Sequence, residues 1–381
     1  MSLNATLGAN PLALEKRLIE VFEENRDAVV RVKAAYRGEK KKGEDGKTQV
    51  TLRMGTGFFV SREGHVLVSA SRAAGADRVW IEFKDQPYAT EVVGHDRFTN
   101  VSVLRVLEPP QDFSIIHVDG NVDPPKIGAI AVAISRPLDF ESSPSMGLVA
   151  GREKRLGSRV FPTEYIRTSI SVDAGQGGCP ILDINGRFIG MTVASIPDLD
   201  GSYCLPAAAL VRVRDEILFA GHVSYSWMGF EVAEKAGDPE AQNGQNVYLS
   251  RVVEGAPADE AGLEEGDILL AIAGREIEEA EDVPGAVFFT RANQFVSIEV
   301  RRDGEKREYS VRTKTRPDQE PVKGARLQPV KNLPPATSGA EQERDAAGAA
   351  SPTFDEETVE GVEELDAPDE AEPKANPPKQ E

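Results

Sequence analysis

Between Ala28 and Pro206 the chain consists of short apolar runs separated by turn residues. The runs are rich in Val, Ile and Phe, and Gly, Asp and Pro stand between them. This pattern is typical of a barrel or sandwich made of strands alone. The dipeptide Asn185-Gly186 between two apolar runs is a strong signal for a two-residue hairpin. The spacing predicts two barrels of about six strands over residues 28–208, with strands at 28–36, 57–61, 65–69, 78–83, 91–96, 102–106, 130–134, 145–152, 165–169, 180–184, 187–195 and 201–206.

Residues 173–182 form a glycine-rich loop that reads D-A-G-Q-G-G-C-P-I-L. Glycine at several nearby positions lets the backbone turn so that its N–H groups converge on one point, as in an oxyanion-binding nest. An ordinary turn would use the same residue types. The sequence on either side therefore has to decide between the two interpretations.

Motifs on both sides of this loop carry a resemblance to a known family. The loop itself resembles the nucleophile loop N-P-G-N-S-G-G-P-L of trypsin-like serine proteases of the HtrA type. Five other motifs occur in HtrA order and spacing: G-T-G-F-F-V-S at 55–61, G-H-V-L-V-S-A-S at 64–71, G-A-D-R-V at 75–79, V-V-G-H-D at 92–96 and N-G-R-F-I-G-M at 185–191. The resemblance implies a mostly β chain with a chymotrypsin-like double β-barrel over residues 28–218.

All three catalytic positions of that family are changed in this chain. Aligned through these motifs, the histidine position holds Ser71, the aspartate position holds Asn100 and the nucleophile position holds Gly177. Serine does not accept a proton near neutral pH as imidazole does, and glycine has no group that attacks a carbonyl. The loop residues Gly175 and Gln176 align with the oxyanion-binding turn of that family. The resemblance therefore implies a pseudoprotease with no catalytic residue.

A displaced nucleophile is the alternative hypothesis. Cys179 lies two residues beyond Gly177, and as a thiolate it would need a base, for which His95 is the candidate among the four histidines. An inert, buried thiol is the competing interpretation of Cys179 and also of Cys204. Both cysteines fall near the specificity pocket of the resembled fold, so a disulfide between them is conceivable, which spacing alone does not decide.

Residues 219–317 resemble a PDZ domain. In that family Met228-Gly229-Phe230 would be the loop that receives the carboxylate of a peptide C-terminus, and the next strand would pair with the peptide. The apolar residues expected to line the peptide pocket, which could equally be core residues, are Phe230, Val232, Val283, Val287 and Phe288. The implied partners are peptide or protein C-termini.

The two ends of the chain have different characters. Residues 1–27 are predicted to contain a helix that begins at Asn10-Pro11 and has one apolar face, formed by Leu14, Leu18, Val21 and Phe22. Residues 318–381 contain 16 acidic and 6 basic residues and nine prolines, which predicts a disordered acidic tail. This tail carries −10 of the net charge of −19.

Charge and composition restrict the partners. An acidic chain has no electrostatic reason to bind nucleic acid, and no run is apolar enough for a membrane span. No cofactor or metal site is expected. With no export signal in the first residues, the chain is expected to be cytoplasmic, or extracytoplasmic by resemblance if a signal has been removed. The expected function is peptide and unfolded-chain binding through the PDZ domain and barrel cleft, as scaffold, chaperone or regulator, with a homotrimer or an active HtrA relative as the further partner.

Overall fold

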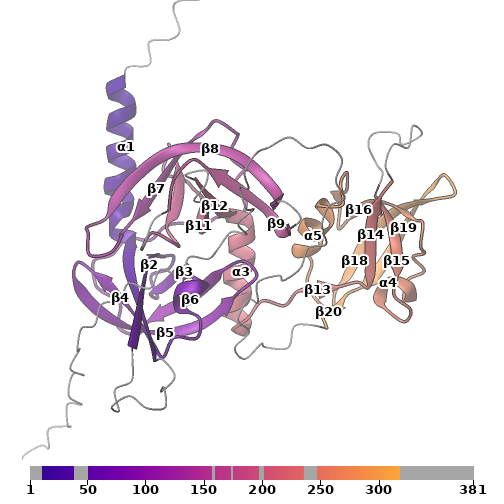
Figure 1. Cartoon of the computed structure of the whole chain (residues 1–381), viewed down its shortest axis with the longest axis horizontal. Coiled ribbons are helices and arrows are strands. Elements are labelled where there is room, and N and C mark those ends of the chain that lie inside the picture. The colour runs from indigo at the N-terminus through magenta and orange to yellow at the C-terminus, as the bar shows by residue number, and fades with distance from the viewer. Residues whose placement is uncertain are drawn as a thin grey trace, which may run out of the picture.

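The computed structural model describes residues 11–37, 50–156, 159–172, 175–196, 201–235 and 247–317. Its strands form two closed barrels, a separate six-stranded sheet and a two-stranded sheet (Figure 1). The mostly β architecture predicted from the sequence is therefore confirmed. The predicted tail at 318–381 lies outside the described residues.

The first barrel has the strand order β1-β2-β3-β6-β5-β4. Its hydrogen-bonded neighbours are antiparallel throughout, and alternate residues point into an apolar interior. The short helix α2 follows β3. These elements are β1 (Val29–Arg37), β2 (Val50–Phe59), β3 (His65–Ser69), α2 (Ala70–Ala73), β4 (Arg78–Phe83), β5 (Gln86–Asp96) and β6 (Val101–Val106).

The second barrel has the order β10-β11-β12-β9-β8-β7. The predicted hairpin at Asn185-Gly186 joins β10 to β11, and Gly186 takes the left-handed φ of 79° that this turn requires. Two barrels of six strands were predicted and are confirmed. The strands are β7 (Ile130–Ser135), β8 (Ser143–Leu156), β9 (Arg159–Thr168), β10 (Pro180–Asp183), β11 (Phe188–Ile196) and β12 (Gly201–Pro206).

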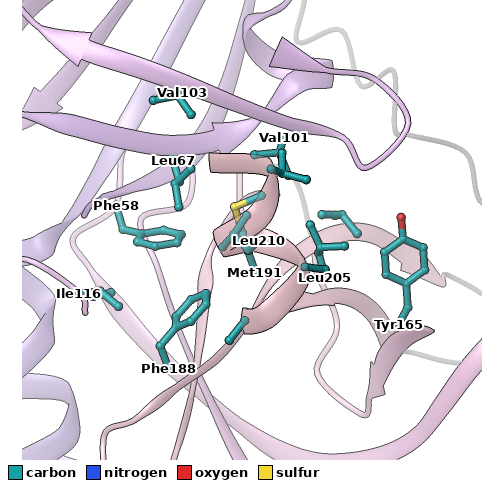
Figure 2. Close-up of a cluster of buried hydrophobic side chains, with 14 of the residues drawn as sticks. Phe58, Leu67, Val101, Val103, Ile116, Tyr165, Phe188, Met191, Leu205 and Leu210 are labelled. Carbon is teal, nitrogen blue, oxygen red and sulfur yellow. The ribbon is translucent and has the colours of Figure 1, made fainter. Parts of the chain in front are cut away.

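The largest apolar cluster joins the two barrels. Phe58 from the first barrel and Phe188 from the second meet with ring centroids 5.6 Å apart, and Met191 is fully buried beside them (Figure 2). Helix α1 (Pro11–Asn25) adds Val21 to this cluster and is followed by the 3₁₀ turn η1 (Arg26–Ala28). The predicted helix is confirmed, but Leu14 of its predicted apolar face is 39% exposed.

Helix α3 (Ala207–Ala220) was not predicted. It begins directly after β12 and ends at Gly221, whose φ of 77° and N–H bond to the Ile217 carbonyl form a left-handed cap. Leu210 and Val213 of this helix are fully buried in the cluster between the barrels. In the sequence, the signal for this helix is the run of apolar and basic residues from Ala207 that precedes Gly221.

The C-terminal part of the described chain has the PDZ fold. Its main sheet has the order β14-β15-β16-β18-β19, with β17 paired to β16, and β13 and β20 form a two-stranded ribbon. Because β14 pairs with β15 alone among the described strands, one edge of β14 is open. The elements are β13 (Ser226–Trp227), β14 (Phe230–Glu234), β15 (Val247–Val252), α4 (Pro257–Glu260), β16 (Ile268–Ile272), β17 (Arg275–Glu276), α5 (Asp282–Phe288), β18 (Phe295–Arg302), β19 (Glu305–Arg312) and β20 (Lys314–Thr315).

Helix α5 connects the PDZ domain with the second barrel. It lies between the PDZ sheet and the end of β9 (Figure 1). Lys154 Nζ, near the end of β8, lies 2.5 Å from the Asp282 carboxylate, and Arg155 Nε lies 3.3 Å from that of Glu281. These pairs are partly exposed, so they orient the two domains more than they stabilise them.

Candidate functional site

A hydrogen bond joins two of the three positions that align with the catalytic residues of the resembled family. Ser71 lies in α2, directly after β3, and Asn100 lies in the turn between β5 and β6. The Ser71 N–H donates to Asn100 Oδ1 at 2.7 Å, and the Ala70 N–H donates to the Asn100 carbonyl at 3.1 Å. Asn100 has a φ of 58°, a left-handed conformation that asparagine tolerates better than most residues. The fold thus brings together the two positions that the sequence indicated.

The third position, Gly177, faces the same point from the second barrel. Its carbonyl accepts a hydrogen bond of 3.1 Å from the Thr56 N–H. A Cβ atom added at Gly177 would lie 3.9 Å from Arg72 Nε and 3.9 Å from Ser69 Oγ, with nothing closer. There is room for a side chain at this position, so crowding does not require the glycine.

Both polar atoms of the Asn100 side chain make hydrogen bonds. While Oδ1 accepts from Ser71, Nδ2 donates to the Val193 carbonyl at 2.7 Å, and the residue is 4% exposed. A carboxylate cannot make the second bond because it has no N–H group. The contacts at this position therefore suit an amide and would repel an aspartate.

The glycine loop is anchored on Thr56. Thr56 Oγ1 donates to the Gly175 carbonyl at 2.8 Å and accepts from the Arg136 N–H at 3.1 Å. The Gly178 N–H donates to the carbonyl of Thr192 at 3.2 Å. Among the described residues no hydrogen bond uses the N–H groups of Gly175 or Gly177. The predicted loop residues Asp173 and Ala174 lie outside the described residues.

Cys179 lacks the features of a nucleophile. It is 1% exposed, its sulfur lies 3.3 Å from Thr192 Oγ1, and burial raises its pKa to about 11. A thiol with a raised pKa holds its proton at neutral pH and is unreactive. Cys204 is also a free, fully buried thiol whose pKa burial raises, so the conceivable disulfide is not formed.

Two of the four histidines make side-chain hydrogen bonds in the described structure. His65 Nδ1 bonds with Ser61 Oγ at 2.8 Å, and His222 Nδ1 lies 3.0 Å from the Ala220 carbonyl. His95, the base of the alternative hypothesis, is exposed on β5 in register with Ser102, and partial burial lowers its pKa. The hydrogen bonds of His65 and His222 therefore involve neither Ser71 nor Gly177.

Arginines near the altered positions were missed by sequence reasoning. Arg72, only 8% exposed, lies alongside Gly55 and Gly177, and Arg53 Nη1 donates to the Ser71 carbonyl at 3.3 Å. The Arg53 guanidinium also stacks 4.6 Å from the centre of the Tyr36 ring. Residues scattered along β1, β2 and α2 come together here, which no local pattern reveals.

Asp96 links the turn at Asn100 to the start of the PDZ domain. Its carboxylate accepts from the Thr99 N–H at 3.1 Å and from the Tyr225 hydroxyl at 2.6 Å. Tyr225 is buried, and burial together with the nearby Asp96 charge raises its pKa well above the usual value. The segment that leads into the PDZ domain is therefore attached to the loop that positions Asn100.

The backbone carbonyls of the predicted carboxylate-binding loop in the PDZ domain accept hydrogen bonds that hold the loop in place. The Met228 carbonyl accepts from the Ala258 N–H at 2.9 Å, and the Gly229 carbonyl accepts from the Val253 N–H at 2.8 Å. Among the described residues no hydrogen bond uses the N–H groups of Met228 or Gly229. Gly229 has a φ of 82°, which glycine adopts without strain.

The predicted pocket residues divide into two groups. Phe230 and Val232 of β14 are partly buried beside the PDZ core, as is Val287 of α5, whereas Met228 and Val283 belong to the core itself. Phe288 contradicts the prediction of a pocket position, because it is 2% exposed and packs in the cluster between the barrels. Its ring lies 6.0 Å from that of Tyr225. On a helix, neighbouring residues point about 100° apart, so Val287 and Phe288 cannot face the same surface.

Comparisons with known proteins agree with the two-domain reading. Residues 55–191 match the trypsin-like peptidase domain family, and residues 226–313 match the PDZ domain family. The chain carries a trypsin-like peptidase domain followed by one PDZ domain. Over 277 residues it is 29% identical to a probable periplasmic serine endoprotease, DegP-like, from Marinomonas sp. (strain MWYL1); the match covers 70% of this chain and 58% of that relative. A DegP-like relative from Chlamydia trachomatis is 26% identical over 266 residues, covering 68% of the chain and 53% of the relative.

Solved structures share the fold of this chain. The HtrA-type protease AlgWS227A with decapeptide aligns with a TM-score of 0.63 at 22% identity, covering 80% of this chain and 99% of that one. A serine endoprotease from Yersinia pestis aligns with a TM-score of 0.55 at 17% identity, covering 78% and 97%. Within the described ranges, no helix has the length and apolar character needed to cross a membrane.

Proposed function

We propose that this HtrA homologue binds peptides and does not cleave them. The supporting observation is the site in which Ser71, Asn100 and Gly177 stand at the three catalytic positions, with an amide held where a carboxylate would be needed. A protease of this fold needs a base, a nucleophile and a group that orients the base. The proposed role is that of a scaffold, chaperone or regulator of peptides and unfolded chains.

Hydrolysis assays test this proposal directly. With purified full-length protein, casein and labelled peptides should be cleaved no faster than in buffer, and a fluorophosphonate probe should label no serine. Iodoacetamide and the Cys179→Ala change should leave this background unchanged. Turnover that a serine-directed inhibitor abolishes would overturn the proposal, and turnover lost in Cys179→Ala would favour the thiol alternative.

The PDZ domain is proposed to bind the C-terminus of a peptide along the open edge of β14. The N–H groups of Met228 and Gly229 would receive the carboxylate, and Phe230, Val232 and Val287 would contact the peptide side chains. A helix and an edge strand that flank such a loop are the usual elements of β-strand addition. The decapeptide named with a structural neighbour is consistent with peptide binding.

Changing Gly229 to alanine is expected to weaken binding of a C-terminal peptide at least about tenfold, because the loop must shift. A Cβ atom at Gly229 would lie 2.2 Å from Ala256 Cβ, and the φ of 82° is strained for alanine. Gly255→Ala is the matched control, since its φ is 70° and an added Cβ meets nothing within 4 Å. Calorimetric titration with free and amidated peptides measures the effect, and equal weakening by both variants would contradict it.

Location and assembly are proposed by analogy. The relatives are named periplasmic, so we infer an extracytoplasmic location for this chain. Helix α1 exposes three apolar side chains, Leu12 at 67%, Leu14 at 39% and Ile19 at 55%. We infer that Leu12 and Ile19, which lie on one face of the helix, support a homotrimer or contact with an active relative. Light scattering of the purified protein would show a monomer if the inference is wrong.

A further inference from the structure

A carboxylate bridges the far end of the proposed peptide groove in the PDZ domain. Glu234, the last residue of β14, accepts a hydrogen bond of 2.7 Å from the Ala280 N–H, two residues before α5 begins. Strand β14 and helix α5 are the two walls of the groove, so this bond joins them at the end opposite the carboxylate loop. Glu234 is exposed, and its Oε2 atom makes no hydrogen bond within the described part of the chain.

The charge of Glu234 lacks the cation partners that neighbouring carboxylates have. At the start of α5, Asp282 lies 2.5 Å from Lys154 and Glu281 lies 3.3 Å from Arg155, and both of these cations belong to the barrel. Glu234 forms no ion pair among the residues that the structure describes. Its carboxylate is therefore a charged acceptor that the folded chain leaves unneutralised at the end of the groove.

Lys235, which follows Glu234 in the chain, is directed to the other face of the sheet. Its ammonium lies 5.5 Å from the centre of the Tyr248 ring. Tyr248 stands between the fully buried residues Val247 and Leu249 of β15, so its ring is on the outer face. Glu234 pairs with Val247 in the β14–β15 register and shares the inner face with it. The two opposite charges thus lie on opposite faces.

The direction of a bound peptide follows from the place of the carboxylate loop. The loop precedes β14, so a peptide whose C-terminal carboxylate lies there runs antiparallel to the strand, with its last residue level with Phe230. Side chains alternate along a strand, and Phe230, Val232 and Glu234 occupy alternate positions of β14. The last and third-last residues of the peptide therefore meet the two apolar side chains, and the fifth-last comes level with Glu234.

We propose that Glu234 selects C-terminal peptides that carry lysine or arginine at the fifth residue from the end. The cation of that residue would bond with the carboxylate oxygen that the Ala280 N–H leaves unused, which is a charge-assisted contact. Apolar residues would occupy the last and third-last positions, against Phe230, Val232 and Val287. This inference rests on the proposed binding of peptide C-termini and adds the class of C-terminus that the domain prefers.

The test uses full-length protein and three peptides, Gly-X-Ala-Val-Ala-Val, with a fluorophore at the amino end, a free C-terminus, and Lys, Gln or Glu as X. The Lys peptide is expected to bind at least about fivefold more tightly than the Glu peptide, with the Gln peptide between them, because opposite charges attract and like charges repel. The difference should shrink at about 1 M salt, where the Debye length is about 3 Å.

The variant Glu234→Gln assigns the selection to one residue. Glutamine keeps an oxygen that accepts from the Ala280 N–H and removes the charge, so the Lys and Glu peptides should bind this variant within about twofold of each other. Glu231→Gln is the matched control, because it removes the same charge from an exposed residue of β14 whose carboxylate lies 3.5 Å from Arg251 on β15. This control should keep the preference of the unchanged protein. A preference that persists in Glu234→Gln, or disappears in both variants, would overturn the proposal.

Amidated forms of the same peptides separate this inference from the proposed function. If the PDZ domain does not receive C-terminal carboxylates, free and amidated peptides will bind alike or not at all, and the proposed function fails. If free peptides bind more tightly than amidated ones but their affinity does not depend on X, the proposed function holds and selection by Glu234 is wrong.

Discussion

Replacing Asn100 by aspartate is expected to destabilise the barrel and not to restore catalysis. The Asn100 Nδ2 group donates to the Val193 carbonyl at 2.7 Å in a buried position. An aspartate oxygen there would face another oxygen with no proton between them. Leaving a buried acceptor without a donor costs about 1–3 kcal/mol, and more when the group is charged. Denaturant unfolding of the full-length protein would measure the loss.

The loss of stability caused by Asn100→Asp is expected to grow as the pH rises. The introduced carboxyl is more easily accommodated when protonated, so folding raises its pKa above the unfolded value of about 3.9. For an acid of this kind the unfolding free energy falls as pH rises above the unfolded value. The variant should therefore lose more stability at pH 7 than at pH 4. Asn185→Asp at the exposed hairpin is the control for the change in charge, and equal losses in both variants would contradict the explanation.

The same geometry predicts the outcome of rebuilding the triad. Gly177→Ser alone should fold normally, because an added Cβ has no neighbour closer than 3.9 Å. The triple variant Ser71→His, Asn100→Asp and Gly177→Ser should still fall far short of a protease, because the Val193 carbonyl opposes the orienting carboxylate. Efficient hydrolysis by the triple variant would show that only the three side chains had been lost.

Of the variants proposed for this protein, Phe288→Ala is expected to lose the most stability, about 3–5 kcal/mol of unfolding free energy. The ring is 2% exposed, lies 4.5 Å beneath the Arg212 guanidinium and packs near Tyr225 and Phe289. Removing it would leave a cavity where α5 meets α3 of the barrels. It would also expose Arg212, whose pKa is lowered by burial. Thermal and denaturant unfolding of the full-length protein measure the effect.

Phe295→Ala provides the matched control in the same domain. Phe295 is 73% exposed at the start of β18, so its removal should change stability by less than about 0.5 kcal/mol. Limited proteolysis should cut the Phe288→Ala protein between the barrel and PDZ domains faster than the unchanged protein. Similar stabilities for the two variants would mean that Phe288 does not hold the domains together.

Much of the fold was predictable because it depends on local sequence. The strand at 78–83 and the strand at 201–206 occur with the predicted bounds, and the hairpin at Asn185-Gly186 is formed. Their signals are short apolar runs and turn residues, which act over a few neighbours. Helix α3 was missed because its apolar residues follow a strand without a polar break, although its buried residues Leu210, Val213 and Ile217 recur at helical spacing.

The sequence by itself determined which chemical groups are present at the three positions that align with the catalytic residues of the resembled family. No fold can supply a nucleophile at Gly177 or an imidazole at Ser71, since side-chain chemistry is set by residue type. Only the tertiary structure decided how the remaining groups are used. The amide of Asn100 bonds with Ser71 and Val193, Arg72 lies beside Gly177, and Phe288 faces the barrels and not the peptide groove. These contacts join residues far apart in the chain, and their directions depend on how whole elements pack.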